Sequence, residues 1–196
     1  MDKKIDEIVG LLKKIPGISI RQANKIINFF LDNDVDESKE LFNKIIELAS
    51  QTTKCIQCLA YTNKELCDIC SDKSRQKKLY VVSTNNDINK FEQLDIPKGK
   101  YFIFNELVDL KNVSEKFELK LKKLFELSKQ FDEIILALNS DFNGQITMRY
   151  IEKKLRDELK YYNVYQLSIG IPFGMSIDAV DLITLKQSIL NKKKIN

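Results

Sequence analysis

The chain has 196 residues, of which 43% are hydrophobic and 31% charged, a composition that excludes wholesale disorder. Its formal net charge of +4 does not by itself decide between a nucleic-acid surface and a solvated one, and the absence of histidine excludes Ser-His-Asp and Cys-His nucleophilic catalysis. No apolar run approaches the roughly 20 residues that cross a bilayer, and Met1 to Lys14 is a charged amphipathic segment, so we expect a cytoplasmic protein without a membrane partner.

The first 53 residues are predicted to be all helical. Apolar residues recur at helical spacing in three segments, 5–15, 23–30 and 41–48. A Pro-Gly pair separates the first two segments. The third helix is expected to begin near Ser38, whose hydroxyl would cap the free N–H groups of its first turn.

Four cysteines punctuate the next stretch, which has no helical or strand period. Cys55 and Cys58 form one CxxC pair, and Cys67 and Cys70 form a second pair eight residues later. Two such turns can place four thiolates tetrahedrally around one Zn²⁺. Disulfides are disfavoured in a reducing cytosol, and a redox pair needs only one CxxC. We therefore expect one structural Zn²⁺ per chain, which stabilises a segment with almost no core of its own.

From Leu79 onward, short strands alternate with helices. This order predicts an α/β domain with a mainly parallel sheet, right-handed crossovers and a crevice at the carboxyl ends of the strands. The predicted strands are Leu79 to Ser83, Tyr101 to Phe104, Glu133 to Leu138 and Val164 to Ile169. The predicted helices are Asn86 to Leu94, Ser114 to Lys129 and Gly144 to Leu159.

The Pro-Gly turn, residues 15–19, resembles a helix-hairpin-helix motif, in which a tight hairpin offers backbone N–H groups to a DNA phosphate. Gly17 permits the close approach, and Arg21 and Lys25 on the following helix add positive charge beside the same phosphate. Ser19 stands where the motif usually has a second glycine. The alternative is a plain turn in a helical bundle.

The order of these parts is similar to that of the RecR family of recombination mediators along nearly the whole chain. The stretches that carry the resemblance are CDICSD at 67–72, LYVV at 79–82, EIILALN at 133–139, GxPxG at 170–174 and DxxTL at 181–185. The resemblance implies an α + α/β protein. Its parts would be a helix-hairpin-helix domain (1–53), a four-cysteine zinc finger (54–76), a Toprim-like α/β domain (77–170) and a C-terminal segment (171–196).

The resemblance also implies a function in recombinational DNA repair. Members of the family are non-catalytic clamps that bind single- or double-stranded DNA without sequence preference. The implied partners are RecO and, in some organisms, RecF, with which the clamp loads RecA onto single strands coated by SSB. The implied assembly is a homo-oligomer, with a tetrameric ring as one form.

The predicted Toprim crevice lacks the groups that catalysis would need. A catalytic Toprim domain holds Mg²⁺ with a glutamate and an Asp-x-Asp pair, whereas this chain has Ser83 and Asn139-Ser140-Asp141 at those places. We therefore expect no enzyme activity. Asp141 and Asn143 remain candidate contacts to partner proteins, with capping of the following helix as the alternative for Asp141.

Two other functions compete with this hypothesis. One is a Toprim metal-dependent nuclease or primase-like enzyme with metal ligands at other positions. The other is a structural zinc protein that binds proteins and never DNA. The basic residues of the last predicted α/β helix, Arg149, Lys153, Lys154 and Arg156, are interleaved with acids and are expected to form a solvated face.

Overall fold

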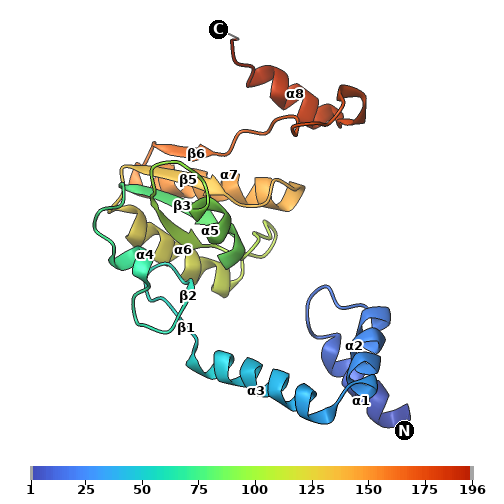
Figure 1. Cartoon of the computed structure of the whole chain (residues 1–196). Helices are drawn as coiled ribbons and strands as arrows, with labels where there is room; N and C mark the ends of the chain where they lie inside the picture. The colour runs from blue at the N-terminus through green and yellow to red at the C-terminus, as the bar shows by residue number, and fades with distance from the viewer. Residues whose placement is uncertain (1, 195–196) are drawn as a thin grey trace. The chain divides into compact units, whose positions relative to one another are not determined.

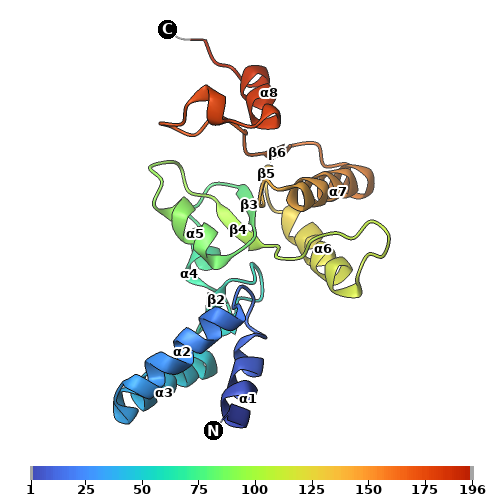
Figure 2. The same cartoon turned by 90° about the vertical axis from the view of Figure 1, so that its right-hand side faces the viewer.

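The structure, a computed structural model, describes residues 2–194 and divides the chain into two compact units. The first unit is Met1–Thr52 and the second is Thr53–Asn196. Figures 1 and 2 show the helical first unit and the mixed second unit, in which helices surround a parallel sheet. Together they confirm the predicted α + α/β fold class. No helix in the described part is long and apolar enough to cross a membrane.

The first unit consists of α1 (Asp2–Leu12), α2 (Ile20–Asp32) and α3 (Val35–Gln51). Helices α1 and α2 contact each other, and the rings of Phe30 and Phe42 join α2 to α3 with centroids 4.9 Å apart. Among the described residues of this unit only Ala23 and Ile27 are buried. The amphipathic patterns predicted these helices, but most of their apolar side chains remain exposed.

Helix α3 begins earlier than the sequence predicted. Its N-cap is Asp34, whose carboxylate accepts the N–H of Asp36 (N···Oδ1 2.7 Å). The hydroxyl of Ser38 instead donates to the carbonyl oxygen of Asp34, at 3.0 Å. The expectation that Ser38 caps this helix was therefore wrong. The acidic first turn, with Asp36 and Glu37, favours the earlier start because negative charge stabilises a helix N-terminus.

The second unit is built around a four-stranded sheet with the order β4-β3-β5-β6, in which every neighbouring pair is parallel. Its elements are β1 (Thr53–Lys54), β2 (Tyr61–Thr62), α4 (Asp68–Ser71), β3 (Lys78–Val82), α5 (Asn85–Glu92), β4 (Lys100–Ile103), α6 (Glu115–Ser128), β5 (Glu133–Ala137), α7 (Phe142–Leu159), β6 (Val164–Gln166), η1 (Ile177–Ala179) and α8 (Leu182–Leu190). Helices α5, α6 and α7 are the crossovers between successive strands. The parallel sheet that the alternating pattern predicted is confirmed, although β6 ends at Gln166 rather than Ile169.

The sheet is covered on both faces, because successive side chains of a strand point to opposite sides. Leu79 and Val81 of β3 pack in the core beneath α6 and α7, whereas Tyr80 and Val82 pack with α5 and the cysteine loop. Figure 2 shows α5 on one side of the sheet and α6 and α7 on the other. The cysteine loop is therefore part of the covering of one sheet face.

The C-terminal part of the second unit, after β6, has little core. Neither η1 nor α8 contains a buried residue. Helix α8 is capped by Asp181, whose carboxylate accepts the N–H groups of Ile183 and Thr184 at 3.0 and 2.9 Å. Leu182 and Ile183 on this helix are largely exposed.

Candidate metal centre and nucleic-acid contacts

The four cysteines converge in one buried cluster. Their sulfur atoms all lie within 4.8 Å of one another, and those of Cys58 and Cys67 are 3.5 Å apart. A tetrahedral site with Zn–S bonds of about 2.3 Å would separate neighbouring sulfurs by about 3.8 Å. The spacing therefore fits a four-coordinate metal ion, and the cluster is able to hold one. The remaining two ligands of the cluster are Cys55 and Cys70.

Local backbone geometry orients the side chains of the first CxxC pair, Cys55 and Cys58. The antiparallel β1–β2 ribbon closes around it, with the N–H of Cys55 donating to the carbonyl oxygen of Ala60 at 2.8 Å. Leu59 adopts a left-handed conformation (φ 64°) that turns the chain after Cys58. The N–H of Ala60 then points to the sulfur of Cys58, at 3.5 Å. Such N–H···S contacts stabilise a thiolate.

The second CxxC pair is set by the short helix α4. Cys67 is its N-cap and Cys70 lies one turn later, so both sulfurs fall on one side of the helix. The N–H of Cys67 also donates to the sulfur of Cys55, at 3.4 Å, which links the two pairs. The four ligands are thereby held from two short elements within one stretch of sixteen residues.

The thiols influence one another strongly. A hydrogen bond from Cys70 lowers the pKa of Cys58 to about 6, and the same bond, together with burial, raises the pKa of Cys70. Burial raises the pKa of Cys67 to about 11. Four thiolates buried side by side would repel one another. A divalent cation would remove this repulsion by neutralising the thiolates.

The cysteine loop is fixed to the sheet by direct bonds. The N–H of Ile103 in β4 donates to the carbonyl oxygen of Cys58 at 2.9 Å, and the ammonium of Lys100 donates to that of Cys70 at 2.6 Å. Cys55 and Cys58 are essentially inaccessible to solvent. The cluster therefore connects the ribbon to the sheet and has no open position for a substrate.

The Pro-Gly hairpin of the first unit has an exposed, left-handed glycine. Gly17 has φ of 86°, and no atom lies within 4 Å of the place where a β-carbon would stand. Ser19 and Gln22 form a capping box that begins α2, with bonds of 2.8 and 3.3 Å. The first N–H groups of such a helix have no acceptor within the helix. The capping box occupies the N–H groups of Ser19 and Gln22, and that of Ile18 donates to the carbonyl oxygen of Ile15, so the N–H groups of Ile20 and Arg21 are the ones left for an anion.

Arg21 and Lys25 lie four residues apart on one face of α2, in the two turns that follow the hairpin. Both side chains are exposed, and within residues 2–194 neither belongs to an ion pair. The hairpin glycine and two free cations therefore occur in one short segment of the first unit.

The carboxyl ends of the strands carry few acids. Ser83 follows β3, Asn105 lies beyond β4 and Asn139 lies beyond β5. Glu106 beside them is held by Lys116 at 2.7 Å and Lys120 at 3.3 Å. In the part of the chain that the structure describes, the four cysteines are the one group of three or more Cys, Asp or Glu side chains placed to share a metal ion.

Asp141 is the N-cap of α7. Its carboxylate accepts the N–H of Gly144 at 2.8 Å, and a β-carbon at Gly144 would collide with the carbonyl oxygen of Asn139 at 1.9 Å. The loop after β5 is thus held tightly to the first turn of α7. Asp141 and Asn143 are both exposed on this turn. Capping accounts for one carboxylate oxygen of Asp141 and leaves the residue accessible to a partner.

One feature was missed by the sequence reasoning. A pocket of about 790 Å³, here called the lysine pocket, opens at the ends of β3 and β4, with Lys54 and Tyr61 on one side and Lys116 and Lys120 of α6 on the other. Lysines at positions 116, 120 and 123 follow a helical period and signalled a basic face of α6. Nothing local placed Lys54 opposite them.

Known proteins resemble both the sheet domain and the chain as a whole. The family model for the Toprim domain matches residues 77–165. Recombination protein RecR of Mycoplasmopsis pulmonis is 40% identical over 190 residues, which cover 96% of this chain and 97% of the relative. That of Ureaplasma parvum is 37% identical over 195 residues, covering 98% and 96%. That of Finegoldia magna is 29% identical over 196 residues, covering 98% and 97%.

The chain belongs to the RecR family.

Membership confirms the resemblance that the motifs indicated. The RecR relatives match from end to end, so the helical unit, the cysteine cluster and the Toprim domain all lie within the shared length. The relatives in this family are named recombination proteins. The cysteine cluster and the Toprim sheet thus both lie in the part of the chain that is shared with these relatives.

Proposed function

We propose that this RecR-family chain is a non-catalytic, DNA-binding clamp of recombinational repair, which works with RecO, and with RecF where it is present, to load RecA. The observation that carries the proposal is the hairpin of the first unit, where Gly17 stands beside the unpaired cations Arg21 and Lys25. The similarity of the whole chain to proteins named recombination proteins supports the same role.

The hairpin is suited to a phosphate rather than to a base. Its open glycine lets an anion approach the backbone closely, and the N–H groups of Ile20 and Arg21 in the first turn of α2 favour negative charge. Arg21 and Lys25 would add two charged contacts along the same face. Contacts of this kind give affinity without sequence information, which is what a clamp that acts anywhere on a chromosome requires.

The metal of the cysteine cluster is proposed to be one structural Zn²⁺ per chain, bound by Cys55, Cys58, Cys67 and Cys70. Four buried thiolates within 4.8 Å suit zinc, and the closed set leaves no place for a catalytic water. The metal would supply folding free energy to the ribbon and α4. Reduced cysteines and a DNA ligand both favour a cytoplasmic location.

The Toprim sheet is proposed to act in binding and not in catalysis. Magnesium keeps its waters unless several hard oxygens converge on it, and Ser83 and Asn139 stand at strand ends where acids would be needed. Asp141 and Asn143, exposed at the start of α7, are proposed to contact a partner protein. The proposed functional regions are residues 1–53, 54–76, 77–170 and 171–196.

A homo-oligomer, with a tetrameric ring as one form, is proposed because the first unit leaves much apolar surface open. Leu41, Phe42 and Ile45 of α3 are each about half exposed, and the more distal Ile46 and Leu48 are more exposed still. Exposed apolar surface of this extent is typical of interfaces. A second copy of the chain would cover these apolar side chains. Removing their surface from water would stabilise the assembly, as it stabilises a hydrophobic core.

The test measures DNA binding of the full chain with Arg21→Ala, Lys25→Ala and the double variant. Each single variant is expected to weaken binding by a similar factor on any sequence, and the slope of log affinity against log salt should become shallower by about 1 per residue on duplex DNA. Zinc content and the far-UV spectrum control for folding. A folded, zinc-loaded double variant with parental affinity and slope would show that the hairpin is only a turn.

A further inference from the structure

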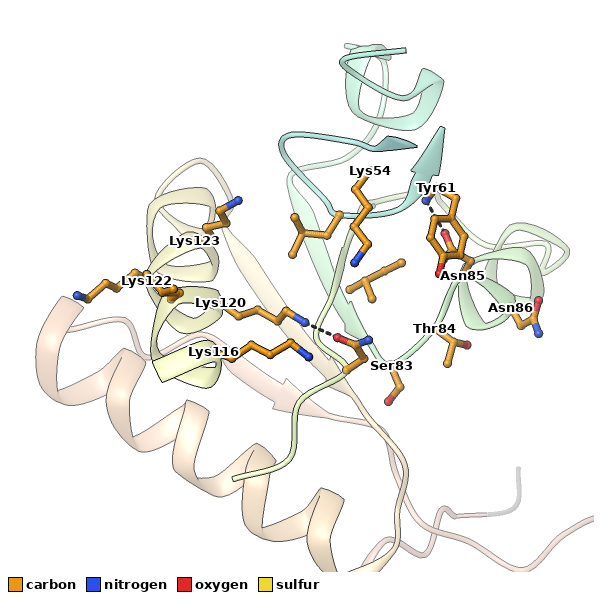
Figure 3. A pocket seen from close by; sticks show the side chains of 14 residues that line it. Lys54, Tyr61, Ser83, Thr84, Asn85, Asn86, Lys116, Lys120, Lys122 and Lys123 are labelled. Atoms are coloured by element: carbon orange, nitrogen blue, oxygen red, sulfur yellow. Dashed lines mark hydrogen bonds between the residues drawn. The ribbon is translucent and has the colours of Figure 1, made fainter. Parts of the chain in front are cut away.

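The lysine pocket collects positive charge in one concave place of the second unit. Lys54 from β1 faces Lys116 and Lys120 from α6 across it, as Figure 3 shows. No carboxylate lines it, and Glu106, which pairs with Lys116 and Lys120, is the acid behind them. Lys122 and Lys123 extend the basic face of α6 at the rim. Three lysines against one glutamate leave the pocket short of negative charge.

The environment of Lys120 shows the effect of this excess of positive charge. Its side chain is only 13% exposed, and its ammonium donates to the side-chain oxygen of Asn105 and pairs with Glu106. Burial lowers the pKa of Lys120, and the charges of Lys116 and Lys54 lower it further, while Glu106 raises it. A mostly buried ammonium with two other lysines around the same pocket gains from any anion that enters. The charge pattern therefore selects for an anionic ligand.

The other residues that line the lysine pocket indicate which kind of anion it binds. Tyr61 exposes 64% of its surface beside the pocket, and its backbone N–H is held by Asn85 at 2.9 Å, so the ring is carried on a fixed strand. Ser83 and Asn86 add neutral hydrogen-bonding groups. An aromatic face beside lysines is the combination used for single-stranded nucleic acid, where bases stack and phosphates meet cations. An acidic peptide would use the lysines but has no need of the ring.

Size agrees with one strand rather than two. A volume of about 790 Å³ is that of a small-ligand site, which admits a nucleotide or two but not a duplex. We propose that the lysine pocket is a second nucleic-acid site, in which Lys54, Lys116 and Lys120 bind phosphates of a single DNA strand while Tyr61 stacks on a base. The site rests on the proposed DNA-binding function for its class of ligand, but not on the hairpin.

The experiment titrates the full chain with a fluorescent oligothymidylate at several salt concentrations. In Lys54→Gln/Lys116→Gln, the slope of log affinity against log salt is expected to become shallower by about 1.4, since each lost contact to a single strand removes about 0.7. Tyr61→Ala should weaken binding roughly fivefold or more, whereas Tyr61→Phe should keep the parental affinity, because stacking needs only the ring.

Matched controls distinguish binding in the lysine pocket from a general effect of positive charge on the surface. Lys111→Gln/Lys129→Gln removes the same charge from surface lysines that do not line the pocket, and it should leave the slope nearly parental. An octaglutamate peptide serves as competitor. If it displaces the oligonucleotide as well as unlabelled strand does, and Tyr61→Ala binds normally, the occupant is an acidic protein segment and the proposal is overturned.

A second measurement avoids substitution altogether. Lysine acetylation of the parental chain, with and without oligothymidylate, should show protection of Lys54 and Lys116 and none of Lys111. Equal modification of all three in the complex would overturn the proposal even if a variant failed to fold.

The hairpin variants distinguish the two proposals. If Arg21→Ala/Lys25→Ala loses binding while Lys54→Gln/Lys116→Gln does not, the clamp function stands and the second site falls. If the parental chain binds no DNA, the proposed function itself falls.

Discussion

The two units bury their apolar residues very differently. In the first unit, Ala23 and Ile27 are the buried residues among those described, and α3 has none. In the second unit, side chains such as Leu124 and Ile151 are completely buried between the sheet and its helices. Both units have amphipathic helices, so amphipathicity alone does not tell how complete a core is. The sheet of the second unit and its helices α5, α6 and α7 cover one another, whereas α3 of the first unit and α8 of the second contain no buried residue.

This difference in burial is consistent with the separate roles proposed for the two units. The second unit has the contacts that make an independently stable domain, with a core on each sheet face and the cysteine cluster on one of them. The first unit presents the turn that is proposed to bind phosphate, before α2, and an exposed apolar surface on α3, and apolar surface of this kind is typical of an interface. The following experiments test that division, beginning with the largest effect.

Loss of the metal should affect the second unit most. Zinc should co-purify at about one atom per chain, and Cys58→Ser should bind less of it and unfold more easily. Structural zinc sites contribute on the order of 10 kcal/mol of binding free energy, so the variant should lose several kcal/mol. Thermal melting and metal analysis measure this. The helical signal of the first unit should persist, because no cysteine lies in it.

Full zinc occupancy with unchanged melting in Cys58→Ser would refute the metal site. A chelator titration of the parental chain provides the matching control without substitution.

Truncation of apolar side chains should change the free energy of unfolding of the two units by different amounts. Leu124→Ala removes a fully buried side chain from the core beneath α6 and α7 and should cost about 2–5 kcal/mol. Leu48→Ala removes a side chain that is 68% exposed on α3, and in the isolated chain it should cost at most about 0.5 kcal/mol. Denaturant unfolding measures both.

The same two variants, Leu124→Ala and Leu48→Ala, also test self-association of the chain. If α3 is covered by a second copy of the chain, Leu48→Ala should weaken self-association in sedimentation, whereas Leu124→Ala should act through folding alone. An unchanged association constant in Leu48→Ala would exclude α3 as that interface.

A partly buried ion pair should make the second unit sensitive to acid. Arg75 binds both carboxylate oxygens of Glu92 at 2.8 Å, and Tyr101 donates to one of them at 2.6 Å. The Arg75 hydrogen bonds lower the pKa of Glu92 to about 2, against the opposing effect of burial. Because the folded pKa lies below the unfolded one, the stabilisation is complete above pH about 4.5 and is lost as the pH falls toward 2.

Glu92→Gln should therefore cost roughly 1–2 kcal/mol at pH 7, a figure reduced for solvent screening. The difference between variant and parent should shrink as the pH falls from 4.5 to 2. A difference that is independent of pH would mean that Glu92 acts by packing and not by charge.

Helix caps should give the smallest effects, and one can be compared in each unit. Ser19→Ala removes the capping box of α2, and Asp141→Ala removes the cap of α7; each should cost about 1 kcal/mol. Asp141→Ser should restore the stability of α7. If Asp141→Ser also restores binding of purified RecO, capping explains the residue. If binding stays lost, the carboxylate contacts the partner, as proposed.

Enzyme activity would give the second unit a role other than the proposed binding role. With Mg²⁺ or Mn²⁺ we expect no nuclease, topoisomerase or ATPase turnover. Turnover that follows the protein through purification and disappears in Asp141→Ala would replace the clamp hypothesis with an enzyme.

The sequence by itself determined the features that depend on near neighbours in the chain. The four cysteines lie within sixteen residues, so their spacing alone specified a common cluster. Alternating strand and helix periods specified the parallel sheet, because crossovers between adjacent parallel strands have one hand and need helices. The Pro-Gly pair specified the hairpin, since glycine is the residue that tolerates its positive φ. The start of α3 was misjudged because both Asp34 and Ser38 are good caps.

The tertiary structure alone decided what distant segments build together. Lys54 and Lys116 meet across the lysine pocket only because the cysteine ribbon packs on the sheet at the ends of β3 and β4. Arg75 and Glu92 pair because α5 returns beside the start of β3. The exposure of α3 is likewise a tertiary fact, since an amphipathic pattern states that a helix has an apolar face but not whether the same chain covers it.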